Sequence, residues 1–342
     1  MTVLSERPVA TPTHRISQHR RVLGRLSATA VVLVLLFALP GLVPAHVVTS
    51  LTVVFALALC AVGFDLAWGF CGIFSFGQAL FLGIGGYTTA ILAGRHGHPA
   101  LVENLLLSGV LGGCAAFVVG AFLFFGRRVG VVFLAVSTLV ISYVAAEYAS
   151  SSTYLGGEDG LTGLPYPSLG NVDFRQPTNL YDLCLGVTVA GVGLSALLLR
   201  SHFGTVMRAI RADEVRAAQL GYRTVAVKLI VFTYAGVLSA IAGSLYAFVQ
   251  GGISPITVGV NQSTEIVLWV LIGGSGTLIG GLGGAALLEI LGTQLSGEAA
   301  RIWPIALGAI LVLFATRLPR GLLPYLTDAG RTMGRRLTRR RK

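Results

Sequence analysis

The chain has 342 residues, of which 54% are hydrophobic and only 11% are charged. Soluble domains carry about 25% charged residues, so this composition excludes a water-soluble globular protein and indicates an integral membrane protein. The net charge of +11 does not indicate nucleic-acid binding, because the basic residues neither share one face nor alternate with aromatic side chains.

About ten segments are apolar enough for spanning helices, each of which needs roughly 20 residues. The first follows a basic tail and resembles a secretory signal, but its apolar run is long and contains Pro40 and Pro44. It also lacks a small-residue cleavage site, so we expect it to be retained as a span. The segments lie near residues 26–44, 47–68, 72–93, 101–125, 129–149, 180–199, 228–250, 264–280, 282–297 and 302–317.

The basic residues predict the orientation of the chain. If the amino terminus is cytoplasmic, all but three of the 25 Lys and Arg residues lie on the inner side, as the positive-inside rule requires. We therefore expect both termini in the cytoplasm, with the arginine-rich carboxyl terminus in contact with anionic membrane lipid. The expected parts are a basic tail over 1–25, a membrane domain over 26–317 and a basic tail over 318–342.

A polar loop over residues 150–179 is expected on the outer side. It contains GGEDGLTGLPYPSLG, whose glycines and prolines predict tight turns. Glu158 and Asp159 lack the spacing of a calcium-binding loop, so solvated turn residues are expected there.

A second polar segment, residues 200–228, is expected on the cytoplasmic side and carries six basic residues. Residues 205–220 lack Gly and Pro and predict a helix that Gly221 ends. Their apolar residues form no clean stripe, which argues against a helix lying on the membrane surface. The expected ion pairs, each between residues three apart, are Arg211 with Glu214 and Asp213 with Arg216.

Two glycine clusters occupy matching positions if the spans divide into five plus five. The first lies in GFCGIFSFGQALFLGIGGYTTAIL and the second in IVLWVLIGGSGTLIGGLGGAAL. Glycines also permit close helix packing, but each cluster adjoins polar residues, which favours helices broken beside a transport pathway. The fold prediction is an all-α polytopic membrane protein with an inverted five-plus-five repeat and Gly-broken helices. The candidate pathway residues are Ser75, Gln78, Gly85, Gly86, Thr138, Glu147, Glu265, Gly274 and Ser275.

The sequence predicts no catalytic residue, metal ligand or cofactor. The GGSG stretch at Ser275 fits a short intramembrane-protease pattern, but every histidine lies in a tail or at the end of a span. The same stretch lacks the Gly-Lys-Ser/Thr of a P-loop, so ATP binding of that kind is not expected. The cysteines lie in apolar runs without metal-type spacing and are expected to be small buried residues: Cys60, Cys71, Cys114 and Cys184.

Several motifs together resemble the permease subunits of ABC importers for branched-chain amino acids. They are GFDLAWGFCGIFSFGQALFLGIGGYTTAIL, GGEDGLTGLP, RAIRADEVRAAQLGY, SPITVGVNQSTEIVLWVLIGGSGTLIGGLGGAAL and IALGAILVLFATRLPRGLLP, spread over residues 47–324. The chain is most similar to the longer of the two permeases, which has an extended outer loop. Permeases of urea and short-chain amide importers share nearly the same pattern, so these solutes stay open.

The resemblance implies a bacterial inner-membrane protein that forms a heterodimer with a second homologous permease. It also implies two cytoplasmic ATPase subunits and an extracytoplasmic solute-binding protein. In such permeases an EAA-like cytoplasmic pattern forms a coupling helix that docks on the ATPase. In this chain Val215 and Arg216 separate the acidic residue from the alanines. The implied coupling residues are Arg211, Asp213, Glu214, Ala217, Ala218 and Gly221.

Two rival hypotheses remain. A secondary transporter driven by protons or sodium would need titratable groups within the membrane, for which Glu289 is the clearest candidate. A passive amide or urea channel would need neither ATP nor a gradient of ions.

Overall fold

The computed structural model describes residues 31–125, 130–170, 172–295, 308–310, 312–313, 316 and 321. Within this part almost all regular structure is helical, as composition predicts, and two short strands pair, β1 (Leu161–Thr162) and β2 (Gly252–Ile253). The chain divides into two units, Met1–Ala45 and His46–Lys342. In the first, an apolar helix covers Val31–Gly41 and ends in the 3-10 turn η1 (Leu39–Gly41).

Five helices of the described residues are long and apolar enough to cross a membrane. Each exceeds the roughly 20 residues that a bilayer requires, so the protein is a multi-pass membrane protein. They are α2 (Ala45–Asp65) with its π-helical extension η2 (Leu66–Phe70), α4 (Leu101–Phe124), α5 (Val131–Ser151), α6 (Pro177–Arg200) and α9 (Thr224–Gln250).

Three further helices of the described chain pack into the same bundle. Helix α3 (Gln78–Thr89) continues into the π-helical η3 (Ala90–Arg95). Helices α10 (Val260–Gly273) and α11 (Gly280–Leu295) form an antiparallel pair. Their backbones touch where Gly273 meets Gly280 and where Gly284 meets Trp269.

Helix α9 is the centre of the bundle and packs along both α3 and α4. Small residues allow this approach, because a Cβ built at Gly85 or at Gly243 would overlap the backbone of the facing helix. Phe232 of α9 contacts Phe81 and Phe124 edge to face, with ring centroids 5.5 and 5.7 Å apart. The core is therefore built from close backbone contact and interlocked aromatic rings.

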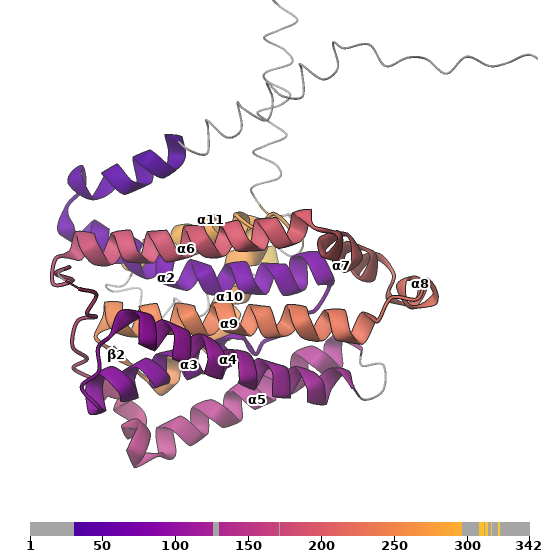
Figure 1. The fold of residues 1–342 in the computed structure, drawn as a ribbon, viewed down its shortest axis with the longest axis horizontal. Helices are drawn as coiled ribbons and strands as arrows, with labels where there is room; N and C mark the ends of the chain where they lie inside the picture. Colours follow the sequence, from indigo (N-terminus) through magenta and orange to yellow (C-terminus); the bar gives the residue numbers. More distant parts are fainter. Residues whose placement is uncertain are drawn as a thin grey trace, which may run out of the picture. The chain divides into compact units, whose positions relative to one another are not determined.

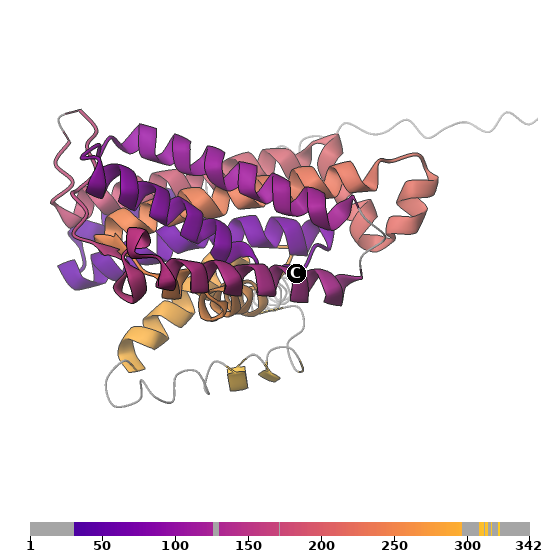
Figure 2. The same cartoon turned by 90° about the horizontal axis from the view of Figure 1, so that it is seen from below.

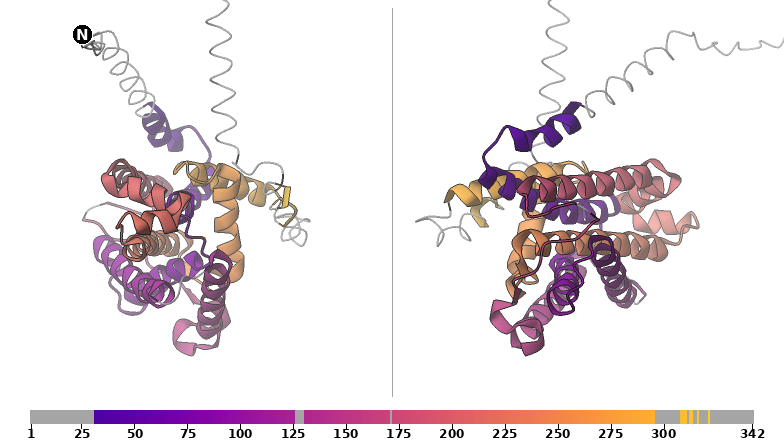
Figure 3. Two further views of the ribbon diagram at one scale, coloured as in Figure 1. Left: turned by 90° about the vertical axis from the view of Figure 1, so that its right-hand side faces the viewer. Right: turned by 60° about the vertical axis from the view of Figure 1, so that its left-hand side comes forward.

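The two polar segments lie at opposite ends of the bundle (Figures 1 and 2). One end carries the β1–β2 pair and the short 3-10 turns η4 (Thr153–Leu155), η5 (Gly157–Asp159) and η6 (Pro255–Thr257). The other end carries α7 (His202–Ala212) and α8 (Glu214–Gln219), and the left view of Figure 3 looks onto it. The predicted turns are confirmed at Gly156 and Gly160, which have φ of +89° and +74°.

The glycine clusters break the helices in two different ways. Residues 72–77 are non-helical, so the predicted span over 72–93 starts as a helix only at Gln78. The turn predicted between the spans over 264–280 and 282–297 lies earlier in the chain, because α10 ends at Gly273 and residues 274–279 turn the chain back into α11. The second cluster thus makes a helical hairpin.

Three other expectations need comment. Cys114 is exposed on the surface of α4, so the prediction that all four cysteines are buried is wrong for this one. The predicted span over 26–44 lies partly, and that over 302–317 mostly, outside the described residues. The tail over 1–25 and Arg127 and Arg128 lie wholly outside them, and Gly321 is the one described residue of the tail over 318–342.

Candidate functional site

The segment predicted to couple to an ATPase folds as two helices instead of one. Asp213 has an extended backbone, with φ −161° and ψ +102°, and separates α7 from α8. Its carboxylate accepts a hydrogen bond from the Arg216 backbone N–H at 3.0 Å, as an N-cap residue does. Asp213 therefore ends one helix and starts the next, which composition alone did not reveal.

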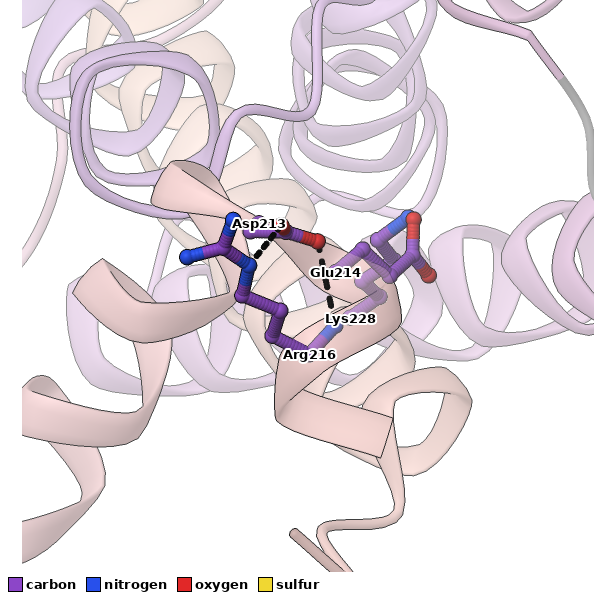
Figure 4. A network of polar contacts seen from close by, with 4 residues as sticks. All are labelled: Asp213, Glu214, Arg216 and Lys228. Atoms are coloured by element: carbon purple, nitrogen blue, oxygen red, sulfur yellow. Dashed lines mark hydrogen bonds and ion pairs between the residues drawn. The ribbon is translucent and has the colours of Figure 1, made fainter. Parts of the chain in front are cut away.

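Two ion pairs hold α8 (Figure 4). Arg216 Nε lies 2.9 Å from Asp213 Oδ2, which confirms the predicted pair. The predicted pair of Arg211 with Glu214 does not form, since Glu214 Oε2 lies 2.5 Å from Lys228 Nζ at the start of α9. This second pair ties α8 directly to the central helix of the bundle.

Helix α7 does have an apolar stripe, so the prediction that none exists is wrong. Val206, Met207 and Ile210 are buried and Phe203 is half-buried, a spacing that places all four on one helical face. The face packs against α6, η2 and α9. The break at Asp213 shifts the phase of the following residues, which hides the stripe when residues 205–220 are read as one helix.

Helix α8 turns one alanine inward and one outward. Ala217 is 2% exposed, whereas Ala218 is exposed. Val215 and Leu220 are 44% and 77% exposed. Gly221, with φ +89°, follows the helix and lets the chain turn towards α9. The outer face of α8 is small, partly apolar and open.

Beneath α7 lies a group of contacts that we call the Asp65 node: Asp65, Gly69, Arg211, Gly276 and Leu278. The fully buried Asp65 carboxylate accepts hydrogen bonds from the backbone N–H groups of Gly276 at 2.6 Å and Leu278 at 2.8 Å. Arg211, at the last turn of α7, donates from Nη1 to the Gly69 carbonyl oxygen. The node thus joins α2, α7 and the 274–279 turn.

Three predicted pathway residues lie in or beside the non-helical stretch 72–77. Thr138 Oγ1 accepts a hydrogen bond from the Phe76 backbone N–H at 3.0 Å, and Ser75 Oγ accepts one from Gly77 N–H at 3.0 Å. Gln78 Oε1 accepts from Ser239 of α9 at 2.7 Å. The Gln78 Nε2 group is buried and has no partner among the described residues.

The other predicted pathway residues lie elsewhere. Gly85 packs closely against Ala240 of α9, and Gly86 packs against Ile253 of β2 and Gly243 of α9. Glu147 is exposed and lines an open cavity of about 420 Å³ with Glu158 at the β1–β2 end of the bundle. Glu265 is half-buried on α10, and Gly274 and Ser275 lie in the turn between α10 and α11. The structure therefore does not gather these residues into one site.

Sequence reasoning missed five members of these contacts: Asp65, Gly69, Lys228, Gly276 and Leu278. Asp65 was recognisable as an acidic residue in an apolar run, which usually marks a buried partner. Lys228 was recognisable as a basic residue near the start of the apolar run that forms α9. Nothing local indicated the role of Leu278, since it supplies only a backbone N–H.

Comparison with known proteins identifies related chains. Residues 46–315 match the family described as the permease component of the branched-chain amino acid transport system. The high-affinity branched-chain amino acid transport system permease protein LivM of Salmonella typhimurium is 27% identical over 316 residues, which cover 85% of this chain and 73% of the relative. LivM of Escherichia coli is 26% identical over the same shares of the two chains. The ribose import permease protein RbsC of Bacillus subtilis is 28% identical over 46% of this chain and 53% of its own length.

No solved structure matches the chain. The family match extends from the beginning of α2 to beyond α11, so it includes the α7–α8 segment and the 274–279 turn. It also includes all five helices that are long enough to cross a membrane, apart from the first residue of α2. The chain therefore belongs to the family of permease components of branched-chain amino acid transport systems.

Proposed function

We propose that this permease is the membrane subunit of an ATP-driven importer that carries branched-chain amino acids into the cytoplasm of a bacterium. The two LivM relatives are permease proteins of branched-chain amino acid transport systems, which supports this solute class. The observation that carries the proposal is the α7–α8 segment at one end of an apolar bundle. Its apolar face is docked on the bundle, and the outer face of α8 is open to a partner.

The partners would be a second homologous permease, two cytoplasmic ATPase subunits and an extracytoplasmic solute-binding protein. We assign the ATPase contact to the outer face of α8. Ala218 is exposed there between Val215 and Leu220, and small side chains let a groove approach closely. Arg211, Asp213, Glu214, Ala217 and Gly221 would then hold α8 in place from behind.

The orientation would place α7 and α8 in the cytoplasm and the β1–β2 end outside. About ten spans in an inverted five-plus-five arrangement fit this orientation and the length that spans require. The position of the two polar segments at opposite ends of the bundle supports it. The basic tails would then lie on the inner side, in contact with anionic lipid.

Coupling would begin when ATP draws the ATPase subunits together and displaces α8. The Glu214–Lys228 pair would pass this displacement to α9, which packs against α3 and α4. The permease would then shift between inward-open and outward-open states, to the extent that the partners bind the two states with different affinity. The polar groups around residues 72–77 would lie beside the solute.

The proposal is tested on the complete importer in proteoliposomes. We expect uptake of labelled leucine that requires ATP and the binding protein. The variant Gly221→Pro should insert normally and lose ATP-coupled uptake, because Pro cannot adopt the positive φ of this residue. Gradient-driven uptake by the chain alone would refute the proposal in favour of a secondary transporter. ATP-driven uptake of urea or amides but not of leucine would refute the proposed solute class.

A further inference from the structure

Asp65 has a role that helix packing does not require. Its carboxylate is fully buried at the end of α2, and a buried charge is costly unless strong hydrogen bonds compensate it. Both oxygens are used, one on the Gly276 N–H and one on the Leu278 N–H. Asp65 therefore fixes the backbone of the 274–279 turn, more than 200 residues away in sequence.

The turn that Asp65 fixes is strained. Leu278 has φ +62°, and it is the one non-glycine residue with positive φ among the described residues. Such a backbone persists only where the surroundings impose it, and such residues are frequent in segments that switch conformation. Gly274 and Gly276 also have positive φ, of +114° and +80°. Without Asp65 the turn would lose two of the contacts that impose this conformation.

Arg211 connects the same turn to α7. It donates to the Gly69 carbonyl oxygen, and the Gly69 backbone lies directly against Gly276. A Cβ built at Gly276 would lie 3.1 Å from Arg211 Nη1 and 3.1 Å from the Gly69 oxygen. A displacement of α7 therefore cannot occur without changing the packing around Gly276.

We propose that Asp65 and Arg211 are positioning residues that transmit movement of the α7–α8 segment to the 274–279 turn, and so to α10 and α11. The inference rests on the proposed coupling function and adds a second route to it. The first route runs from Glu214 through Lys228 to α9, and this one runs through the node to the α10–α11 hairpin. The two routes end in different helices, so they can be separated by measurement.

The experiment uses spin-label distances in the complete importer, with and without vanadate-trapped nucleotide. Two labelled pairs are compared, Val215→Cys with Leu106→Cys for α8, and Ile279→Cys with Leu106→Cys for the turn. All three positions are exposed, and Cys114→Ser removes the exposed native thiol. The uptake of leucine per ATP hydrolysed is measured on the same samples.

In the otherwise unaltered chain, both distances should change on trapping. In Asp65→Asn and in Arg211→Ala, the α8 distance should still change while the turn distance does not. Leucine moved per ATP should fall about fivefold or more, the lower end of couplings between two sites. The matched control is Thr188→Val, which removes an equally buried hydrogen bond to Phe55 and should preserve both changes.

Several outcomes would overturn the inference. It fails if the turn distance is constant in the unaltered chain, or if it still changes in both variants. If Asp65→Asn does not assemble, Arg211→Ala decides alone, since Arg211 is exposed and the Asp65 carboxylate keeps its hydrogen bonds from Gly276 and Leu278 in that variant. If the unaltered chain shows no ATP-driven uptake and its α8 distance does not change on trapping, the proposed function is refuted, and the inference with it.

Discussion

Glu214 Oε2 lies 2.5 Å from Lys228 Nζ, so the first residue of α8 is joined to the first turns of the longest helix of the described bundle. Lys228 is 19% exposed in its side chain and Glu214 is 39% exposed, which places the pair between a surface contact and a buried one. The pair is therefore better suited to fix the position of α8 than to stabilise the whole fold.

We predict that Glu214→Lys leaves the protein inserted but separates ATP hydrolysis from uptake. Exposed ion pairs contribute about 0–1 kcal/mol, so the free energy of unfolding should change little. The double variant Glu214→Lys with Lys228→Glu rebuilds the pair with reversed charges and should recover part of the leucine moved per ATP. Equal uptake in the single and double variants, at the level of the unaltered chain, would remove this pair from the mechanism.

We predict that Asp213→Ala frays α8. Loss of an N-cap side chain costs about 1 kcal/mol, whereas the ion pair with the 83% exposed Arg216 adds little. Hydrogen exchange of the Ala217 and Ala218 amides should become faster than in the unaltered chain. Asp213→Ser keeps a capping oxygen and should retain most of the protection. Equal exchange in all three proteins would show that the cap is dispensable.

We predict that Gly85→Ala prevents normal packing of α3 on α9. A Cβ at this position would overlap the backbone of Ala240, and neither helix backbone can give way cheaply. Gly186→Ala on α6 is the matched control, because nothing lies within 4 Å of a Cβ built there. The control should gain about 0.5–1 kcal/mol of helix stability. Thermal unfolding in detergent measures both, and an unaltered midpoint for Gly85→Ala would contradict the packing described.

We predict that Leu220 and Tyr154 are reached from opposite sides of the membrane. Both side chains are exposed, at 77% and 55%, and they lie at the two ends of the bundle. In vesicles that hold the permease without its ATPase subunits, and in a Cys114→Ser background, Leu220→Cys should react with an impermeant maleimide only when the vesicles are inside-out, and Tyr154→Cys only when they are right-side-out. Reaction of both from one side would refute the orientation.

Much of the helical framework was predictable because long apolar runs leave few alternatives in a membrane. The predicted span over 101–125 differs from α4 by a single residue. The position of the turn between α10 and α11 was not predictable in this way, because apolar residues and glycines continue through the turn without a polar boundary. Helix length and turn position there depend on tertiary contacts, such as those of Asp65.

The candidate site shows the same division. The ion pair of Asp213 with Arg216 is local and was predictable from a spacing of three. The same aspartate could equally have stood inside a helix, so its action as a cap could not be deduced from composition. The partners of Glu214 and Arg211 could not be deduced either, since contacts with Lys228 and Gly69 depend on how the chain folds back on itself.

The short β1–β2 pair has a consequence for the end of the bundle opposite α7 and α8. Leu161 pairs with Ile253, the Leu164 N–H donates to the Gly251 oxygen, and Ala100 bridges to Ser168. The long loop is thereby fastened at several points to the ends of neighbouring helices. A protein that binds this loop finds it already ordered, so its association need not be opposed by the entropic cost of ordering a loose chain.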